Sequence, residues 1–183
     1  MRTFAFTVTL ALALALALAL ALPCATASAS ETKAGPEAKR NLWAFTEQIA
    51  IALPGDGVHL TELISRHGVR ASTRMVSDKE SMSTEIGPFL FADHIKVQMA
   101  ENDRAESVSF RLSGSCVSLE SVRKRYPNLL VLTHGSSERE WNNFGTQVGD
   151  SIIAFWFQGT NFGCMQKIEV RPAAEILSRL NLD

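Results

Sequence analysis

Residues 150–157 read Asp-Ser-Ile-Ile-Ala-Phe-Trp-Phe, a short apolar run rich in β-branched and aromatic residues, which is typical of a strand. A second segment, Asp93-His-Ile-Lys-Val-Gln-Met99, alternates apolar and polar residues. Such alternation is typical of a strand with one face toward the core and one face in water. Together the two segments predict an antiparallel sheet that is covered on one side.

Helices flank these strands in the sequence. Leu42, Phe45, Ile49 and Leu53 recur at helical spacing and predict an amphipathic helix that ends at Pro54. Shorter helices are expected at residues 60–67, 116–126 and 173–182, further strands at 71–76, 107–112, 129–133 and 165–170, and a polar loop at 135–143. This order predicts the α+β class, with helices packed on one face of an antiparallel sheet.

The order of a helix followed by strands occurs twice. Residues 57–113 align with residues 114–171 at a shift of about 57 residues, which predicts a tandem helix-plus-three-strand repeat. Identity between the halves is slight, so two similar meanders that arose independently are the alternative.

If the halves correspond, the side-chain directions in the strand at 93–99 predict those in the strand at 150–157. The strand at 93–99 directs its apolar side chains to the covered face, and the alignment then puts Ile153, Phe155 and Phe157 on the open face. Three large apolar side chains on an open face would form a patch of the kind that marks a partner surface. The alternative is that the first helix or the C-terminal helix covers them.

Trp141 stands among charged and polar residues in the segment Ser136-Ser-Glu-Arg-Glu-Trp-Asn-Asn143. Tryptophan supplies much binding energy when a partner desolvates it, so Trp141 is a candidate interface anchor. The alternative is that its ring folds back over the core.

The N-terminus has the features of a secretory signal peptide. Residues 4–22 are almost wholly apolar, Pro23 ends the run, and small residues offer cleavage sites after Ala27 or Ala29. The alternatives are an uncleaved membrane anchor and a lipoprotein whose mature chain begins at Cys24. We therefore expect a periplasmic or secreted protein without a stable membrane span after cleavage.

Cleavage defines the rest of the chain. Residues 1–29 would be the signal peptide, residues 30–40 a flexible tail and residues 41–183 a single α+β domain. The mature chain retains two cysteines, Cys116 and Cys164, and two cysteines in an exported protein predict one disulfide. Closing this loop would contribute about 4 kcal/mol in the chain-entropy model.

Composition excludes one class of partner. The chain of 183 residues has 18 Lys and Arg against 19 Asp and Glu. This balance leaves no basic footprint for phosphate neutralisation, so nucleic acid is not an expected partner.

The sequence holds no recognised catalytic motif. His59, His67, His94 and His134 stand in no known catalytic or phosphate-binding setting, and no Cys/His spacing indicates zinc. We therefore assign no catalytic residue, no metal ligand and no cofactor. A reactive cysteine with His94 or His134 as its base is the alternative to the disulfide.

A secreted domain of two helix-plus-antiparallel-sheet units with a disulfide, here over residues 57–170, resembles the β-lactamase inhibitor protein architecture. It is also similar to smaller relatives among outer-membrane assembly lipoproteins. The resemblance is topological and carries no functional residue over to this chain. It implies binding of another protein, in the manner of exported inhibitors and immunity proteins.

The expected function is therefore capture of a partner protein, such as a secreted enzyme or toxin. The residues expected to bind it are Ile153, Phe155, Phe157 and Trp141. The alternatives are a small secreted hydrolase with a Cys/His pair and an envelope assembly or scaffold protein.

Overall fold

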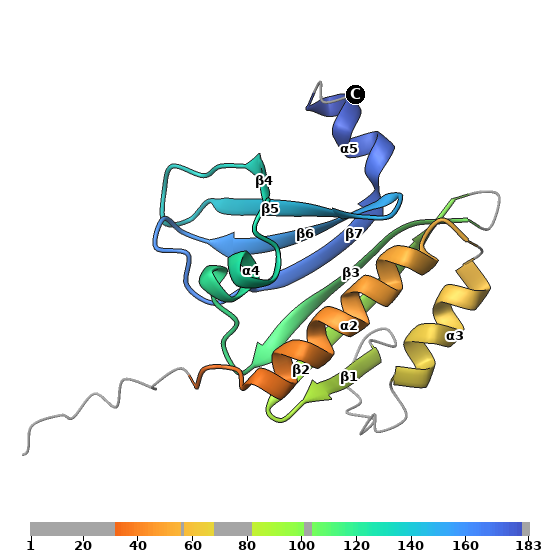
Figure 1. Ribbon diagram of the computed structural model, residues 1–183, viewed down its shortest axis with the longest axis horizontal. Coiled ribbons are helices and arrows are strands. Elements are labelled where there is room, and N and C mark those ends of the chain that lie inside the picture. Colours follow the sequence, from red (N-terminus) through yellow and green to blue (C-terminus); the bar gives the residue numbers. More distant parts are fainter. Residues whose placement is uncertain (1–31, 56, 68–81, 101–103, 181–183) are drawn as a thin grey trace, which may run out of the picture. The chain divides into compact units, whose positions relative to one another are not determined.

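The computed structural model describes residues 32–180 apart from residues 56, 68–81 and 101–103 (Figure 1). The described helices are α2 (Pro36–Ala52), α3 (Gly57–His67), α4 (Leu119–Arg125) and α5 (Ala173–Arg179). The strands are β1 (Met82–Gly87), β2 (Leu90–Met99), β3 (Ala105–Gly114), β4 (Leu130–Thr133), β5 (Trp141–Val148), β6 (Ser151–Gln158) and β7 (Lys167–Pro172). They form one antiparallel sheet in the order β1-β2-β3-β7-β6-β5-β4, which confirms the predicted α+β class.

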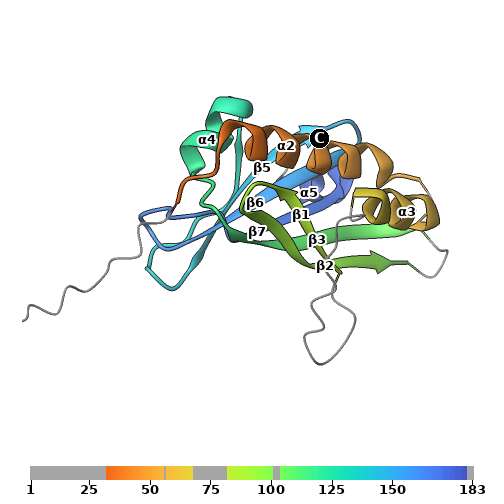
Figure 2. The ribbon, with the colours of Figure 1, turned by 90° about the horizontal axis from the view of Figure 1, so that it is seen from below.

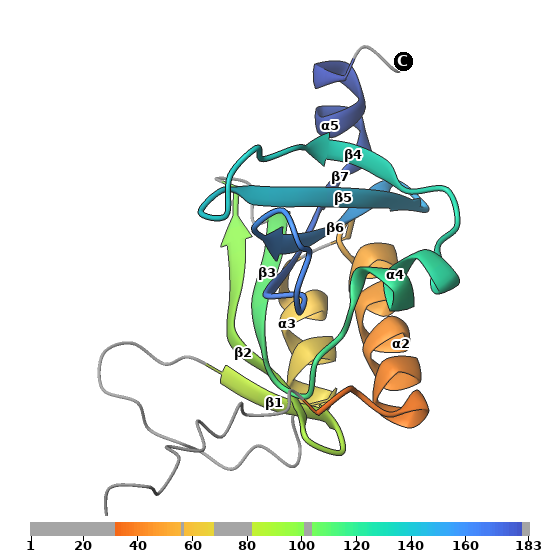
Figure 3. The same ribbon diagram turned by 90° about the vertical axis from the view of Figure 1, so that its left-hand side faces the viewer.

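The sheet consists of two meanders, β1-β2-β3 and β4-β5-β6-β7, which are joined where residues 108–111 of β3 pair with residues 167–170 of β7. Figure 3 shows that the strands of the two meanders run in clearly different directions, as strong twist produces. The second meander has four strands, not the three that the sequence predicted, because β5 was not foreseen. The duplication itself stays a prediction.

Helix α2 covers one face of the sheet. The predicted stripe of Leu42, Phe45 and Ile49 is buried, and the helix contacts β1, β5, β6 and β7. Helix α4 lies on the same side of the sheet as α2 (Figure 2). We call the face toward α2 the inner face and the opposite face the outer face.

The apolar residues of β6 correct one prediction from the sequence. Ile153, Phe155 and Phe157 are fully buried and do not form an exposed patch. The ring of Phe155 packs edge-on against Trp43 of α2, with centroids 6.1 Å apart, which places these residues on the inner face. The first helix therefore covers them, as the alternative foresaw.

A one-residue slip explains the error, because successive strand residues point to opposite faces. Ile95 of β2 is buried and points to the same face of the sheet as Ile153. The alignment had paired Ile95 with Ile152, one position earlier. Strand β2 also carries an irregularity between Asp93 and Lys96, where His94 has φ 55°. Such an irregularity changes which residues of the strand point to each face of the sheet, and it cannot be recognised from the order of apolar and polar residues.

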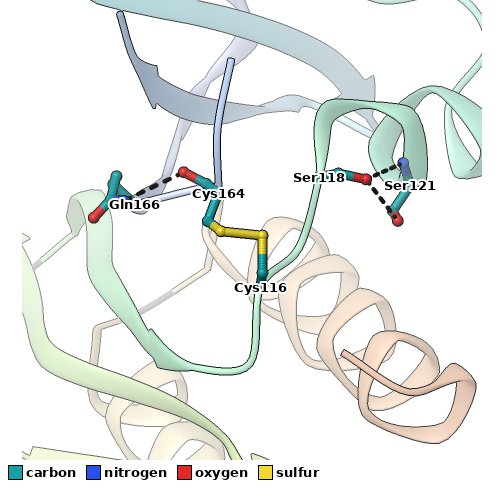
Figure 4. The surroundings of a disulfide bond; sticks show 5 residues. All are labelled: Cys116, Ser118, Ser121, Cys164 and Gln166. Carbon is teal, nitrogen blue, oxygen red and sulfur yellow. Dashed lines mark hydrogen bonds between the residues drawn. A yellow bond between two sulfur atoms is a disulfide. The ribbon is translucent and has the colours of Figure 1, made fainter. Parts of the chain in front are cut away.

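The predicted disulfide between Cys116 and Cys164 is present, with their Cα atoms 5.0 Å apart (Figure 4). It ties the loop before α4 to the loop before β7. Beside it, the Ser118 hydroxyl accepts the backbone N–H of Ser121 at 3.3 Å and caps α4.

The flexible tail expected over residues 30–40 is wrong for its described part. The Ala34 N–H donates to the Cys116 carbonyl at 2.8 Å, and the Cys116 N–H donates to the Thr32 carbonyl at 2.8 Å. Helix α2 already begins at Pro36, since proline suits the first turn of a helix, where no backbone N–H is needed.

Three further predictions concern the C-terminal helix, the signal peptide and the strand at 71–76. In α5 only Ala173 is buried, so the C-terminal helix docks by its first turn. The expected signal peptide, residues 1–29, and the expected strand at 71–76 lie outside the described residues. None of the described helices combines the length and the apolarity that crossing a bilayer requires.

Candidate functional site

A row of opposed residues crosses the outer face of the sheet. Six strands contribute to it, and in order from β4 to β2 its members are Thr133, Asn143, Trp156, Lys167, Arg111 and Asp93. The Cβ atoms of directly opposed residues are typically about 4.5–5.5 Å apart, so these six residues form a continuous strip. We call this strip the outer row. It presents a hydroxyl, an amide, an indole, two cations and a carboxylate in sequence.

Two tryptophans pack against each other at the outer row, Trp156 from within it and Trp141 from beside it. Trp141 lies at the start of β5, is 41% exposed, and packs edge-on against Trp156 with centroids 6.2 Å apart. The Lys167 Nζ lies 5.0 Å from the centroid of Trp156. An indole that is bracketed by a cation and a second indole is held in one orientation.

Two polar atoms in this part of the sheet, Asn143 Oδ1 and Trp156 Nε1, have no hydrogen-bond partner among the described residues. They belong to directly opposed residues of β5 and β6, and both atoms are buried. A buried polar atom without a partner costs about 1–3 kcal/mol, so native proteins keep few of them. We call these two atoms the unsatisfied pair.

The preceding residue, Asn142, shows what a satisfied amide looks like in this strand. It is fully buried, its Nδ2 donates to the Gly159 carbonyl at 2.9 Å, and its Oδ1 accepts the Gly135 N–H at 3.0 Å. Asn142 thus has a structural role, whereas the side chain of Asn143 points to the opposite face and its Oδ1 has no hydrogen-bond partner among the described residues.

A charged strand lies next to the tryptophans. Glu169 of β7 is 6% exposed and is flanked along the strand by Lys167 at 3.0 Å and Arg171 at 2.7 Å. Its opposed residues, Ala154 and Ser109, are small, which lets the two long basic side chains fold over the carboxylate. Burial raises the pKa of Glu169, but the hydrogen bonds and charges of Lys167 and Arg171 outweigh it and hold the pKa below its ordinary value.

A cleft of about 950 Å³ opens where β3 and β7 diverge, beside the end of α2 and the start of α5. Its charged lining residues carry both signs and are Arg104, Glu106, Asp150, Arg171 and Glu175. Arg171 is already paired with Glu169 and Glu175. Neither member of the unsatisfied pair lines this cleft, so the outer row is the stronger candidate.

The structure divides the predicted binding residues between two faces. Trp141 reaches the outer face, whereas Ile153, Phe155 and Phe157 form the core under α2. The residues that the sequence analysis missed are Asn143, Trp156, Lys167 and Glu169. A signal for part of this surface exists in the sequence, because Lys167, Glu169 and Arg171 alternate with apolar residues as one polar strand face.

The chemistry of a Cys/His enzyme is not assembled in the described part of the chain. Cys116 and Cys164 are bonded to each other, so neither offers a thiolate. His94 and His134 are both exposed. Within the same described residues, no cluster of three or more His, Cys, Asp or Glu side chains is arranged to hold a metal ion.

Fold and surface together define an α+β protein with one twisted antiparallel sheet, helices on its inner face and an aromatic and charged outer face. No family model matches the chain, and no curated protein matches it. Among solved structures, a DUF4309 family protein (YjgB) from Bacillus subtilis subsp. subtilis str. 168 is similar with a TM-score of 0.44 and 11% identity, over 74% of this chain and 96% of that one. A likeness at this level carries no inference about activity.

Proposed function

We propose that this chain is an exported protein-binding domain that captures a partner protein on its outer face, at Trp141 and the unsatisfied pair. The observation that carries the proposal is the unsatisfied pair itself, a buried acceptor and a buried donor on directly opposed residues of β5 and β6, one of which packs against the half-exposed Trp141. A peptide group of a partner offers the matching N–H and C=O.

Trp141 is the half-exposed neighbour of this pair. Its ring packs edge-on against Trp156 from the start of β5, and we expect a partner to reach the Trp156 indole N–H when the Trp141 side chain rotates away. A partner that takes the place of the Trp141 ring satisfies both buried atoms and desolvates two tryptophans, which is the composition of an interface hot spot.

The charges of the outer row and of β7 beside it support specificity rather than affinity. Lys167 and Arg171 of β7 are partly exposed cations that Glu169 holds in place, and Arg111 on the neighbouring β3 is exposed. An ordered pattern of charges at the rim of an interface selects the partner and its register. Inhibition of a secreted enzyme or immunity to a toxin is the form of this function that the topological resemblance implies.

The proposed location is the periplasm or the exterior of the cell. The disulfide is consistent with an extracytoplasmic compartment, since disulfides persist in oxidising environments.

The test is site-specific photo-crosslinking in envelope extracts of the native host. Benzoylphenylalanine replaces Trp141 in one protein and, as a control, Ile51 in another, because Ile51 is 69% exposed on α2. We expect an adduct with a partner protein from position 141 that is absent from position 51 and is suppressed by unlabelled wild-type chain.

A conservative competitor tests the unsatisfied pair directly. Trp156→Phe keeps an aromatic ring but removes the indole N–H, so we expect it to compete about tenfold less well than wild type, which corresponds to one hydrogen bond of about 1.4 kcal/mol. Equal competition by Trp156→Phe, or equal adducts from positions 141 and 51, would refute the proposal.

A further inference from the structure

Strand β7 carries a buried carboxylate in the interior of the sheet. The strand lies between β3 and β6 (Figure 1), and Glu169 in its middle is 6% exposed. Charged residues are almost never buried to this extent unless they are paired. The two cations that pair with Glu169 are Lys167 and Arg171, two positions before and after it on the same face of the strand.

Stability gives only part of the reason for a carboxylate at this position. Removing a charge from water costs free energy that an ion pair repays incompletely, and apolar residues often replace a buried ion pair without loss of stability. The side chains of Lys167 and Arg171 are each 35% exposed, so water would solvate both cations if residue 169 were neutral. What Glu169 adds beyond stability is a fixed position for these two cations.

Lys167 connects Glu169 to the tryptophans of the outer row. Its Nζ lies 3.0 Å from Glu169 Oε2 and 5.0 Å from the centroid of the Trp156 ring. A lysine side chain is flexible, and the attraction between a partly exposed ammonium and an aromatic ring is weak by itself. The charge-assisted hydrogen bond to Glu169 therefore keeps the ammonium over the ring.

The orientation of the Trp156 ring decides where its buried N–H points. The torsion that turns an indole relative to its β carbon has a broad, roughly twofold preference, so the backbone alone leaves two directions open. Lys167 over the ring and Trp141 packed against it favour one of them. Because Trp156 Nε1 is the donor of the unsatisfied pair, its direction determines how a partner is bound there.

The second cation of Glu169 belongs to a different branch of the same network. Arg171 lies 2.7 Å from Glu169 Oε1 and 3.5 Å from Glu175 of α5. Glu175 also pairs with Arg179 of its own helix. Among the described residues neither arginine lies over a tryptophan ring, so Glu175 is the matched control for Glu169.

We propose that Glu169 is a positioning residue of the outer row, which acts through Lys167 to fix the Trp156 ring and the direction of its indole N–H. The inference rests on the proposed function, because it concerns the surface that binds the partner. A partner then meets an N–H that is already aimed, and little side-chain freedom is lost on binding.

Fluorine NMR of the full chain labelled with 5-fluorotryptophan tests the positioning without a partner. The chain has three tryptophans, Trp43, Trp141 and Trp156, so three resonances are expected, and tryptophan-to-phenylalanine variants assign them. We expect Glu169→Gln to shift or broaden the Trp156 resonance by more than its linewidth and to leave that of Trp43 in place. Glu175→Gln should change neither.

Variants of Lys167 show whether Glu169 acts through it. Lys167→Met should change the Trp156 resonance as Glu169→Gln does, and the double variant should change it no further. Lys167→Arg keeps a cation over the ring and should preserve the wild-type resonance. Because Lys167 is partly exposed, these variants decide the question even if Glu169→Gln does not fold.

Three results of the NMR experiment would overturn the inference. They are a Trp156 resonance that Lys167→Met leaves unchanged, a change in Glu175→Gln as large as that in Glu169→Gln, and effects of the two single variants that add in the double variant. A folded Glu169→Gln protein with the wild-type Trp156 resonance would overturn it as well.

Competition for the adduct from position 141 relates the positioning to binding. We expect unlabelled Glu169→Gln and Lys167→Met chains to compete about tenfold less well than wild type, since each loses the aim of one hydrogen bond, and Glu175→Gln to compete equally well. Equal competition by Glu169→Gln would overturn the inference. If position 141 gives no adduct at all, the proposed function fails, and the fluorine spectra still decide whether Glu169 positions Trp156.

Discussion

Tyr126, the single tyrosine of the chain, is held by a charged and aromatic cluster between α2 and α4. Its hydroxyl donates to Glu47 Oε1 at 2.7 Å, and Arg125 reaches the same carboxylate at 2.7 Å. Its ring stacks on Phe155 with centroids 5.5 Å apart. Burial, the hydrogen bond to Glu47 and the charge of Glu47 all raise the pKa of Tyr126 well above its ordinary value of 10.0.

Because there is one tyrosine, its titration is directly visible in near-ultraviolet absorbance. We expect no tyrosinate to form in the native protein near pH 10, and normal ionisation there in concentrated urea. The neutral form is favoured by folding, so this contribution to stability is complete below pH 10 and declines as the pH rises above it. Glu47→Gln should lower the native pKa; ionisation of the native wild type near pH 10 would contradict the described contact.

Adjacent identical residues show where sequence reasoning stops at this scale. Asn142 and Asn143 have the same chemistry, yet one satisfies its amide on the inner side and the other leaves an acceptor in the unsatisfied pair. The difference depends on which residue of β6 lies opposite each of them. The strand register cannot be read from a local sequence pattern. The sequence therefore indicated Trp141, an aromatic residue among charges, but not Asn143.

Among the elements, the β1-β2 turn and the end of β3 depend on each other through Gly114. Gly114→Ala brings a Cβ into the Phe89 carbonyl oxygen, whereas Gly149→Ala, at a similarly positive φ, meets nothing within 4 Å. We expect Gly149→Ala to cost about 1 kcal/mol for its backbone conformation and Gly114→Ala about 1–3 kcal/mol more, because the turn must move.

Urea unfolding of both glycine variants measures this difference. Equal losses of stability would mean that the β1-β2 turn shifts without cost, and this would contradict a fixed contact between Gly114 and the Phe89 carbonyl.

Helix α2 was predicted with its core face because the helical period is local and Leu42, Phe45 and Ile49 display it in one segment. Strand β5 was missed because its inner face carries Asn142 and Thr146 beside Phe144, so no apolar alternation marks it. The facing of β6 was reversed because both of its faces are buried and its composition does not distinguish them.

For the molecule as a whole, the disulfide is the principal covalent constraint. Cys116 and Cys164 are separated by 48 positions, and their loop contains α4, β4, β5 and β6. We expect the Cys116→Ser/Cys164→Ser double variant to lose about 4 kcal/mol of unfolding free energy in urea titrations. Reduction of the wild type should cause the same loss, and a free-thiol reaction at either cysteine before reduction would contradict the bond.

The α+β class followed from element order, which the sequence displays. The joining of two meanders into one sheet did not, because it depends on four pairings between β3 and β7 across more than fifty residues. The outer row exists only through that junction, so a surface that spans six strands lies beyond what periodicity and spacing can reveal.

Among the described residues the sheet ends in two edge strands, β4 and β1, and both are poor templates for addition of another chain. β4 offers four residues, and β1 is interrupted between Met82 and Thr84 and again between Glu85 and Gly87. Short or irregular edge strands disfavour pairing with strands of other chains, the step from which fibrils grow. In the extracytoplasmic compartment proposed for this protein, where ATP-driven chaperones are absent, such edge strands would limit aggregation.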